Sequence, residues 1–157
     1  MNPENVIKGM FIIINRPEIF ELINGRRFHF FDAKYKNMKF DDAQYTQTVL
    51  DKIEHSNDLS YQENGFTLLH LAVQEYEYDF VKALLEKKID VNASTKYGIT
   101  PLHTAISRYK GEISDKIIRI LLKHGANYAI SFGGMSAIEF AAQKGIQEKF
   151  EAMLSKQ

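Results

Sequence analysis

Gly65-Phe66-Thr67-Leu68-Leu69-His70-Leu71-Ala72 is followed thirty-three residues later by Gly98-Ile99-Thr100-Pro101-Leu102-His103-Thr104-Ala105. Each copy is followed by a second apolar pair and a polar turn, which run from Leu84-Leu85 to Asn92 and from Leu121-Leu122 to Asn127. A period of this length is typical of stacked supersecondary units, each of which covers the apolar face of its neighbour. The chain is therefore predicted to form a stack.

The first copy predicts two helices and a projecting loop. The hydroxyl of Thr67 is expected to cap an inner helix, because Leu68, Leu69 and Ala72 recur at the spacing of one helical face. An outer helix follows, with Asp79 as its expected cap. Its apolar face consists of four residues: Phe80, Val81, Leu84 and Leu85. The polar segment from Glu86 to Thr95 is predicted to project as a hairpin finger.

The second and third units vary this pattern. The interval from His103 to the next apolar pair is four residues longer than in the first unit, and we place these four residues within residues 108–114, in the turn between helices. In the third unit Glu139 stands where the others carry histidine, and Gly145 stands where they carry tyrosine (Tyr76 and Tyr109). Residues 147–154 are predicted to form a capping outer helix with Lys149 and Glu151 directed outward.

A fainter copy precedes these units. Residues 42–55 predict the outer helix of a degenerate repeat, with an apolar face made by Ala43, Val49, Leu50 and Ile53. Its inner helix is expected within residues 33–40. Two further helices, one capped by Asn2 and one opened by Pro17 and ended at Gly25, are predicted to form a separate N-terminal layer.

The period and the Thr100-Pro101-Leu102-His103 segment resemble the ankyrin repeat, most clearly over residues 61–154. The resemblance implies an all-α, ankyrin-type helical solenoid with short hairpin fingers, of about four units plus the N-terminal helical layer. We expect a single domain over residues 1–157. It divides into the layer (1–25), the degenerate repeat (26–60) and three repeats (61–92, 93–129 and 130–155).

The composition of the chain excludes several classes of function. The chain has 20 basic and 20 acidic residues, so its formal net charge of zero provides no long-range attraction for nucleic acid or a membrane. It has no cysteine, which excludes disulfides and thiolate catalysis and fits a reducing compartment. The longest apolar run, Met10 to Ile14, is far shorter than the about 20 residues of a membrane-spanning helix. We therefore expect no membrane association and a cytoplasmic location.

No catalytic motif is present: the chain lacks a nucleophile elbow, a phosphate-binding glycine loop and a His-Glu-x-x-His helix. Residues one unit apart lie about 10 Å from each other, too far for His70 and His103 to share a zinc ion. The resemblance implies that these histidines bind backbone at the fingers. His124 is predicted to cap a helix C-terminus, and Gly133-Gly134 to form a finger turn. We expect a protein without enzymatic activity, metal or cofactor.

The resemblance implies that a partner binds the fingers and the exposed side of the inner helices. The predicted contact residues are Phe66, Gln74, Glu75, Tyr76, Lys96, Tyr97, Ile99, Arg108, Tyr109, Phe132, Met135 and Lys144. Four of these are large apolar side chains at finger tips, and they are the main candidates for contact energy: Phe66, Tyr97, Phe132 and Met135. The alternative is that the finger aromatics pack between adjacent fingers.

Residues 26–40 mix basic and aromatic side chains. The basic ones are Arg26, Arg27, Lys34, Lys36 and Lys39. They predict a docking patch for an acidic protein surface; single-stranded nucleic acid is the alternative ligand, because interleaved cations and rings are typical of its binding sites. The neutral chain favours the protein.

These observations predict a monomeric, non-catalytic module that binds another protein. By analogy with small ankyrin-like immunity proteins, it is expected to inhibit its partner, for example a toxin. The alternatives are nucleic-acid binding through residues 26–40 and a host-directed ankyrin effector or adaptor. An enzyme with its site between the N-terminal layer and the first regular unit ranks behind these.

Overall fold

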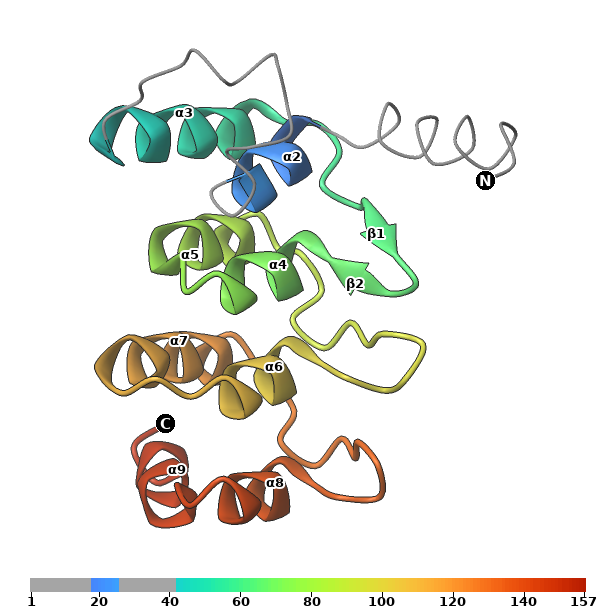
Figure 1. The fold of residues 1–157 in the computed structure, drawn as a ribbon, viewed down its shortest axis with the longest axis vertical. Helices are drawn as coiled ribbons and strands as arrows, with labels where there is room; N and C mark the ends of the chain where they lie inside the picture. Colours follow the sequence, from blue (N-terminus) through green and yellow to red (C-terminus); the bar gives the residue numbers. More distant parts are fainter. Residues whose placement is uncertain (1–17, 26–41) are drawn as a thin grey trace, which may run out of the picture.

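The computed structural model describes residues 18–25 and 42–157, and helices dominate these ranges (Figure 1). The elements are α2 (Glu18–Gly25), α3 (Asp42–His55), β1 (Gln62–Glu63), β2 (Phe66–Thr67), α4 (Leu68–Gln74), α5 (Tyr78–Glu86), α6 (Pro101–Ser107), α7 (Glu112–Lys123), α8 (Ala137–Gln143) and α9 (Gln147–Leu154). None of the helices in these ranges has the length and hydropathy of a membrane-spanning segment.

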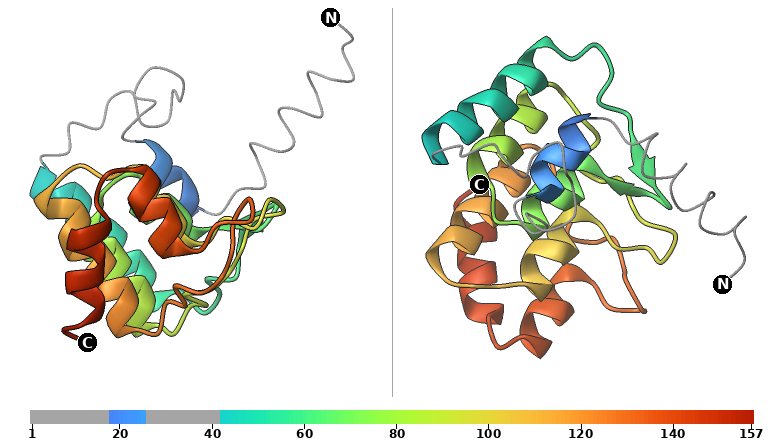
Figure 2. Two further views of the ribbon diagram at one scale, coloured as in Figure 1. Left: turned by 90° about the horizontal axis from the view of Figure 1, so that it is seen from below. Right: turned by 45° about the horizontal axis from the view of Figure 1, so that its top comes forward.

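The described helices form two columns. The inner column contains α2, α4, α6 and α8, the outer column contains α3, α5, α7 and α9, and the connecting loops project on one side as fingers (Figures 1 and 2). Within the columns, α4 packs on α6, α6 on α8, α3 on α5 and α5 on α7. The predicted all-α solenoid with hairpin fingers is thus confirmed.

The three regular inner helices begin in the same way. Thr67, Thr100 and Ser136 each accept a hydrogen bond from the backbone N–H three residues later, and the side chain at that later position bonds back to the cap backbone. This reciprocal capping box satisfies two of the donors that a helix N-terminus leaves unpaired. The predicted cap at Thr67 is confirmed.

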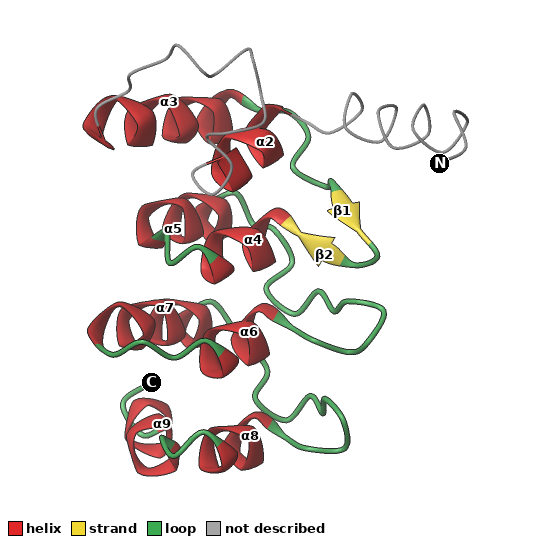
Figure 3. Cartoon of the chain, viewed as in Figure 1, coloured by secondary structure: helices red, strands yellow, loops and turns green. Residues whose placement is uncertain are grey.

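The fingers are short hairpins (Figure 3). In the first, β1 and β2 are antiparallel, and in the third Phe132 and Met135 form a single bridge. Adjacent fingers are also joined, because Lys96 N–H donates to Asn64 O at 2.8 Å. The finger boundaries differ from those predicted: α5 continues through Glu86, so the connecting segment begins one residue later and extends beyond Thr95 into a turn closed by Gly98 N–H and Thr95 O.

A continuous apolar core runs between the two columns. Its large, fully buried side chains include Leu69, Phe80, Ile106, Ile118 and Phe150. In the degenerate unit α3 has the bounds predicted for it, and Val49 and Ile53 are buried as expected. Ala43, assigned to the same face, is exposed instead, because it lies in the first turn of α3.

The inner helix of the degenerate unit was predicted at the wrong place. The helix α2, assigned to a separate N-terminal layer, packs on both α3 and α4 and so occupies the inner column. Its buried residues, Ile19, Phe20, Leu22 and Ile23, supply the apolar face that this position requires. Residues 33–40 and the predicted helix capped by Asn2 lie outside the described residues.

The four surplus residues of the second unit lengthen a helix. The turn after α6 gains one residue over the turn after α4, whereas α7 has 12 residues and α5 has 9. The prediction that the surplus lies in the turn is therefore wrong for three of the four residues. The added turn of α7 is stabilised by Ile113, which packs against the core, and the buried hydroxyl of Ser114 accepts a hydrogen bond from Lys110 N–H at 2.8 Å.

Asp79 was also assigned wrongly. It lies in the first turn of α5, where a carboxylate interacts favourably with the helix dipole, but the cap residue is Glu77 and makes no side-chain cap bond. His124, by contrast, is the C-cap of α7 as predicted, and its Nδ1 lies 2.9 Å from Ile120 O.

Candidate functional site

The predicted contact residues fall into two rows, one along the finger tips and one along the turns after the inner helices. The finger row has one prominently exposed large apolar side chain, that of Tyr97, which is 69% exposed. The ammonium group of Lys96 lies 5.1 Å from the centre of its ring. A cation over an aromatic ring forms a rigid, amphipathic pair, which is well suited to contact a partner.

The other finger aromatics are engaged within the scaffold. The ring of Phe66 stacks on His70 at 5.2 Å, and the ring of Phe132 meets His103 edge to face at 5.9 Å. Phe132 also contacts Phe140, and Met135 packs against the core. Phe66 and Phe132 thus pack on side chains of the inner helices, whereas the alternative prediction placed the finger aromatics between adjacent fingers. This leaves Tyr97 as the finger side chain with most area free for a partner.

Ile99 is held by the backbone. Its carbonyl lies 2.9 Å from both Thr95 N and His70 Nε2, and its side chain is half-buried. It therefore fixes the position of the Lys96–Tyr97 tip.

The turn row carries charge of both signs. Glu75, Arg108 and Lys144 are the C-cap residues of α4, α6 and α8, so they occupy equivalent places in successive units. Gln74 donates to the Glu75 carboxylate at 3.2 Å. The ammonium group of Lys144 lies 5.8 Å from the centre of the Phe140 ring. The row is therefore negative at the end of α4 and positive at the ends of α6 and α8.

Tyr76 links the first two turns. Its hydroxyl donates to Arg108 O at 2.8 Å, and its ring lies 5.9 Å from the Arg108 guanidinium and 5.2 Å from Lys110 Nζ. Its φ of 59° is in the left-handed region, which costs a non-glycine residue about 1 kcal/mol or more. The hydrogen bond to the next unit offsets this strain. Among the described residues, Arg108 Nε is buried without a hydrogen-bond partner.

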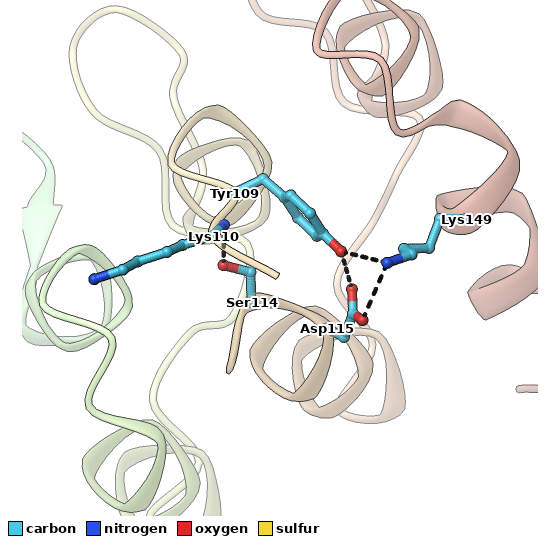
Figure 4. A network of polar contacts seen from close by, with 5 residues as sticks. All are labelled: Tyr109, Lys110, Ser114, Asp115 and Lys149. Atoms are coloured by element: carbon cyan, nitrogen blue, oxygen red, sulfur yellow. Dashed lines mark hydrogen bonds and ion pairs between the residues drawn. The ribbon is translucent and has the colours of Figure 1, made fainter. Parts of the chain in front are cut away.

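Tyr109 follows the C-cap of its inner helix as Tyr76 does, but its φ is not positive, and in the second turn Gly111 takes the left-handed conformation instead. Its hydroxyl donates to the Asp115 carboxylate at 2.6 Å and accepts from Lys149 Nζ at 2.9 Å (Figure 4). Lys149 also lies 3.6 Å from Asp115. Burial and the Asp115 bond raise the pKa of Tyr109, while Lys149 lowers it.

This network places Tyr109 in the scaffold. Lys149, which was predicted to be directed outward, ties α9 to the preceding unit, and Lys110 N–H donates to Ser114 at 2.8 Å to hold the turn (Figure 4). Tyr109 and Lys149 are forty residues apart, so no local pattern indicates their contact.

His70 and His103 are structural. Burial lowers the pKa of both, and backbone carbonyls of the following finger, those of Ile99 and Ile130, act in the opposite direction. His70 Nε2 is bonded to Ile99 O, whereas His103 Nε2 does not reach the geometry of a hydrogen bond with any described residue. The part of the chain that the structure describes contains no cluster of three metal-ligating side chains. The basic residues from Arg26 to Lys39 lie outside it.

Comparison with known proteins identifies the family. The sequence matches ankyrin repeats, in three copies, over residues 42–130, which is more than half of its 157 residues. The chain belongs to the ankyrin-repeat family. Ankyrin repeats are protein–protein interaction modules, and the family is generally non-catalytic.

Similar proteins come from distant sources. The chain is 33% identical over 119 residues to the ADP-ribosylation factor GTPase-activating protein AGD4 of Arabidopsis thaliana, a match that covers 75% of this chain and 14% of the plant protein. It is 30% identical over 99 residues to ankyrin repeat protein OPG189 of Monkeypox virus, which covers 60% of this chain and 18% of the viral protein. The chain thus spans less than a fifth of the length of these two relatives.

Two solved structures share the fold. The ankyrin repeat protein EF0377 superposes with a TM-score of 0.62 at 27% identity, over 71% of this chain and 58% of that one. An ankyrin repeat domain from Acinetobacter baumannii gives a TM-score of 0.66 at 22% identity, over 87% of this chain and 62% of that one. At that identity the second match shows the fold alone.

Proposed function

We propose that this chain is a non-catalytic binding module that holds another protein against its finger tips and inner turns. The observation that carries the proposal is the contrast among the finger aromatics. Phe66 and Phe132 pack on histidines of the scaffold, whereas Tyr97 is 69% exposed beside Lys96. An exposed tyrosine on a rigid tip contributes contact area at low entropic cost.

The turn row supplies specificity. Arg108 and Lys144 favour acidic side chains on the partner, and Glu75 at the other end favours a basic one. The guanidinium of Arg108 already lies over the Tyr76 ring, 5.9 Å from its centre, which reduces the side-chain entropy lost when a carboxylate binds it.

Inhibition of the partner is the specific form of this function that we propose. A module that covers a partner's surface blocks whatever that surface does, as an immunity protein blocks a toxin. Support comes from the absence of any catalytic motif in the sequence and from an exposed contact row built on a fixed scaffold. We further propose a monomeric, cytoplasmic protein, which fits a chain without cysteine.

A pull-down with the tagged chain from cells of its source organism, read out by mass spectrometry, identifies the partner. The purified pair should form a one-to-one complex. Tyr97→Ala and Arg108→Ala should each weaken it by about 1 to 3 kcal/mol. Tyr128→Ala is the matched control, because Tyr128 is 45% exposed and lies outside the predicted contact residues. Equal losses in all three variants, or turnover of a substrate by the chain alone, would contradict the proposal.

A further inference from the structure

A second surface lies on the outer column. An open groove runs between α5 and α7, which pack against each other. The outer column lies on the side of the molecule away from the fingers (Figure 2). On α5 the lining residues follow at intervals of four, Tyr78, Lys82 and Glu86. On α7 they include Lys116, Ile120 and Lys123 at similar spacing. Residues three and four apart share a helix face, so each helix presents one continuous stripe to the groove.

The groove is strongly basic for a chain of zero net charge. Four cations, Lys82, Lys116, Arg119 and Lys123, line it together with one carboxylate, Glu86. Because the chain as a whole is neutral, this charge acts only locally.

Two of the four cations are weakly paired. Lys82 lies 4.0 Å from Glu86 and Lys116 lies 3.2 Å from Glu112, and all four side chains are more than half exposed. Exposed pairs at this spacing contribute at most a few tenths of a kcal/mol, so a ligand can displace them. Within the described ranges neither Arg119 nor Lys123 forms an ion pair. Their charges are available to a ligand.

The wall of the groove is also partly apolar. Ile120 lies at the edge of the core at 9% exposure, and the half-buried ring of Tyr78 flanks the groove from α5. The methylene stems of lysine and arginine add apolar surface while their charged ends stay in water. A ligand that fits this lining carries apolar side chains as well as negative charge.

We infer that the groove between α5 and α7 binds an acidic protein segment in which carboxylates alternate with apolar side chains. The carboxylates pair with Arg119, Lys123 and the neighbouring lysines, and the apolar side chains contact Ile120 and Tyr78. Single-stranded nucleic acid fits less well, because its sites present a succession of stacking rings, whereas the rings that line this groove are those of Tyr78 and His124. This surface lies on the outer column, away from the finger that carries Tyr97, so the inference does not depend on the proposed function.

The test uses the full chain and a short fluorescein-labelled peptide that alternates pairs of glutamate with leucine. At low ionic strength the peptide should bind about tenfold more tightly than the same peptide with glutamine in place of glutamate. The double variant R119E/K123E should lose this preference. The matched control is K96E/K144E, which changes the net charge equally but on the other face, and it should retain the preference.

Three results would overturn the inference. The first is equal affinity for the glutamate and glutamine peptides, and the second is an equal loss of binding in both double variants. The third is displacement of the labelled peptide by an unlabelled oligo-dT strand at lower concentration than by the unlabelled peptide. That result would make phosphate the recognised group. Circular dichroism tests whether each variant is folded. If R119E/K123E is not folded, it is replaced by R119Q/K123Q, which removes the two charges without reversing them. Variants in this groove should leave binding of the partner protein at Tyr97 unchanged. That result would show that the two surfaces bind independently.

Discussion

The Nε2 atom of His70 lies 2.9 Å from the carbonyl oxygen of Ile99 in the next unit of the stack. A carbonyl only accepts, so Nε2 carries the hydrogen and Nδ1 is free to accept from Thr67 N–H, 3.1 Å away. The neutral imidazole therefore caps its own helix and fastens it to the following finger. Protonation of Nδ1 removes the acceptor and so breaks the cap.

This geometry makes the stack sensitive to acid. Burial lowers the pKa of His70 and His103 below the usual 6.5, so their contribution to stability is present above that value and is lost as the pH falls through the lower, folded-state pKa. We expect the double variant H70Q/H103Q to lose about 1 to 2 kcal/mol at neutral pH, because the bond to Ile99 is removed. Glutamine can still complete a capping box.

The measurement is the urea midpoint as a function of pH. Between about pH 7 and 5 the midpoint should fall less in the double variant than in the parent chain. His55 is exposed, so H55Q is the control and should follow the parent. An equal fall of the urea midpoint in the parent chain and the double variant would contradict the assigned role of the two histidines.

Gly65 should be far less tolerant of alanine than Gly134. Both have a φ of 80°, so the backbone strain of the substitution is the same. A Cβ at Gly65 would overlap Ser94 O and approach Thr95 Cα to 2.7 Å, whereas one at Gly134 meets no described atom within 4 Å. We expect G134A to cost about 1 kcal/mol and G65A to cost about 1 to 3 kcal/mol more. Chemical denaturation of both variants measures the difference, and equal costs would contradict the close finger packing.

Lys149 should hold the last helix in place. K149M removes the bond to Tyr109 and the ion pair with Asp115, so we expect faster amide hydrogen exchange in α9 with little change in α4 and α5. The effect should shrink at high salt, since Lys149 is 54% exposed. K116M is the control, because Lys116 pairs within its own helix. Unchanged exchange in α9 would show that the network in Figure 4 does not anchor it.

The hydroxyl of Tyr76 should stabilise the folded chain. Y76F keeps the ring beside the Arg108 guanidinium but removes the bond to Arg108 O, so we expect a loss of about 1 kcal/mol in the free energy of unfolding. Y78F is a suitable control, because no hydrogen bond is found for the hydroxyl of half-buried Tyr78 among the described residues. A neutral Y76F would mean that the left-handed turn is held by packing alone.

Local signals in the sequence predicted the regular parts of this fold. The helices α3 and α9 have the predicted bounds, and the caps at Thr67 and His124 are where the pattern placed them. These features depend on residues within one or two helical turns, so periodicity and cap chemistry suffice to find them.

The errors arose where distant contacts decide the structure. The apolar face of α2 predicted a helix. Its place in the inner column depends on packing against α3 and α4, which come later in the chain, after residue 41. In the extra turn of α7, Ile113 packs against the core that other elements form. The pairing of Tyr109 with Lys149 could not be predicted because the two residues are forty positions apart and neither lies in a recognisable motif.

Site-specific photo-crosslinking in cells of the source organism tests the proposed binding face most directly. A crosslinking phenylalanine analogue at position 97 should trap a single protein adduct, which R108A should weaken. The same analogue at position 128, also exposed, should trap little. No adduct at position 97 above the level at position 128 would contradict the central claim that the Tyr97 face binds a partner protein.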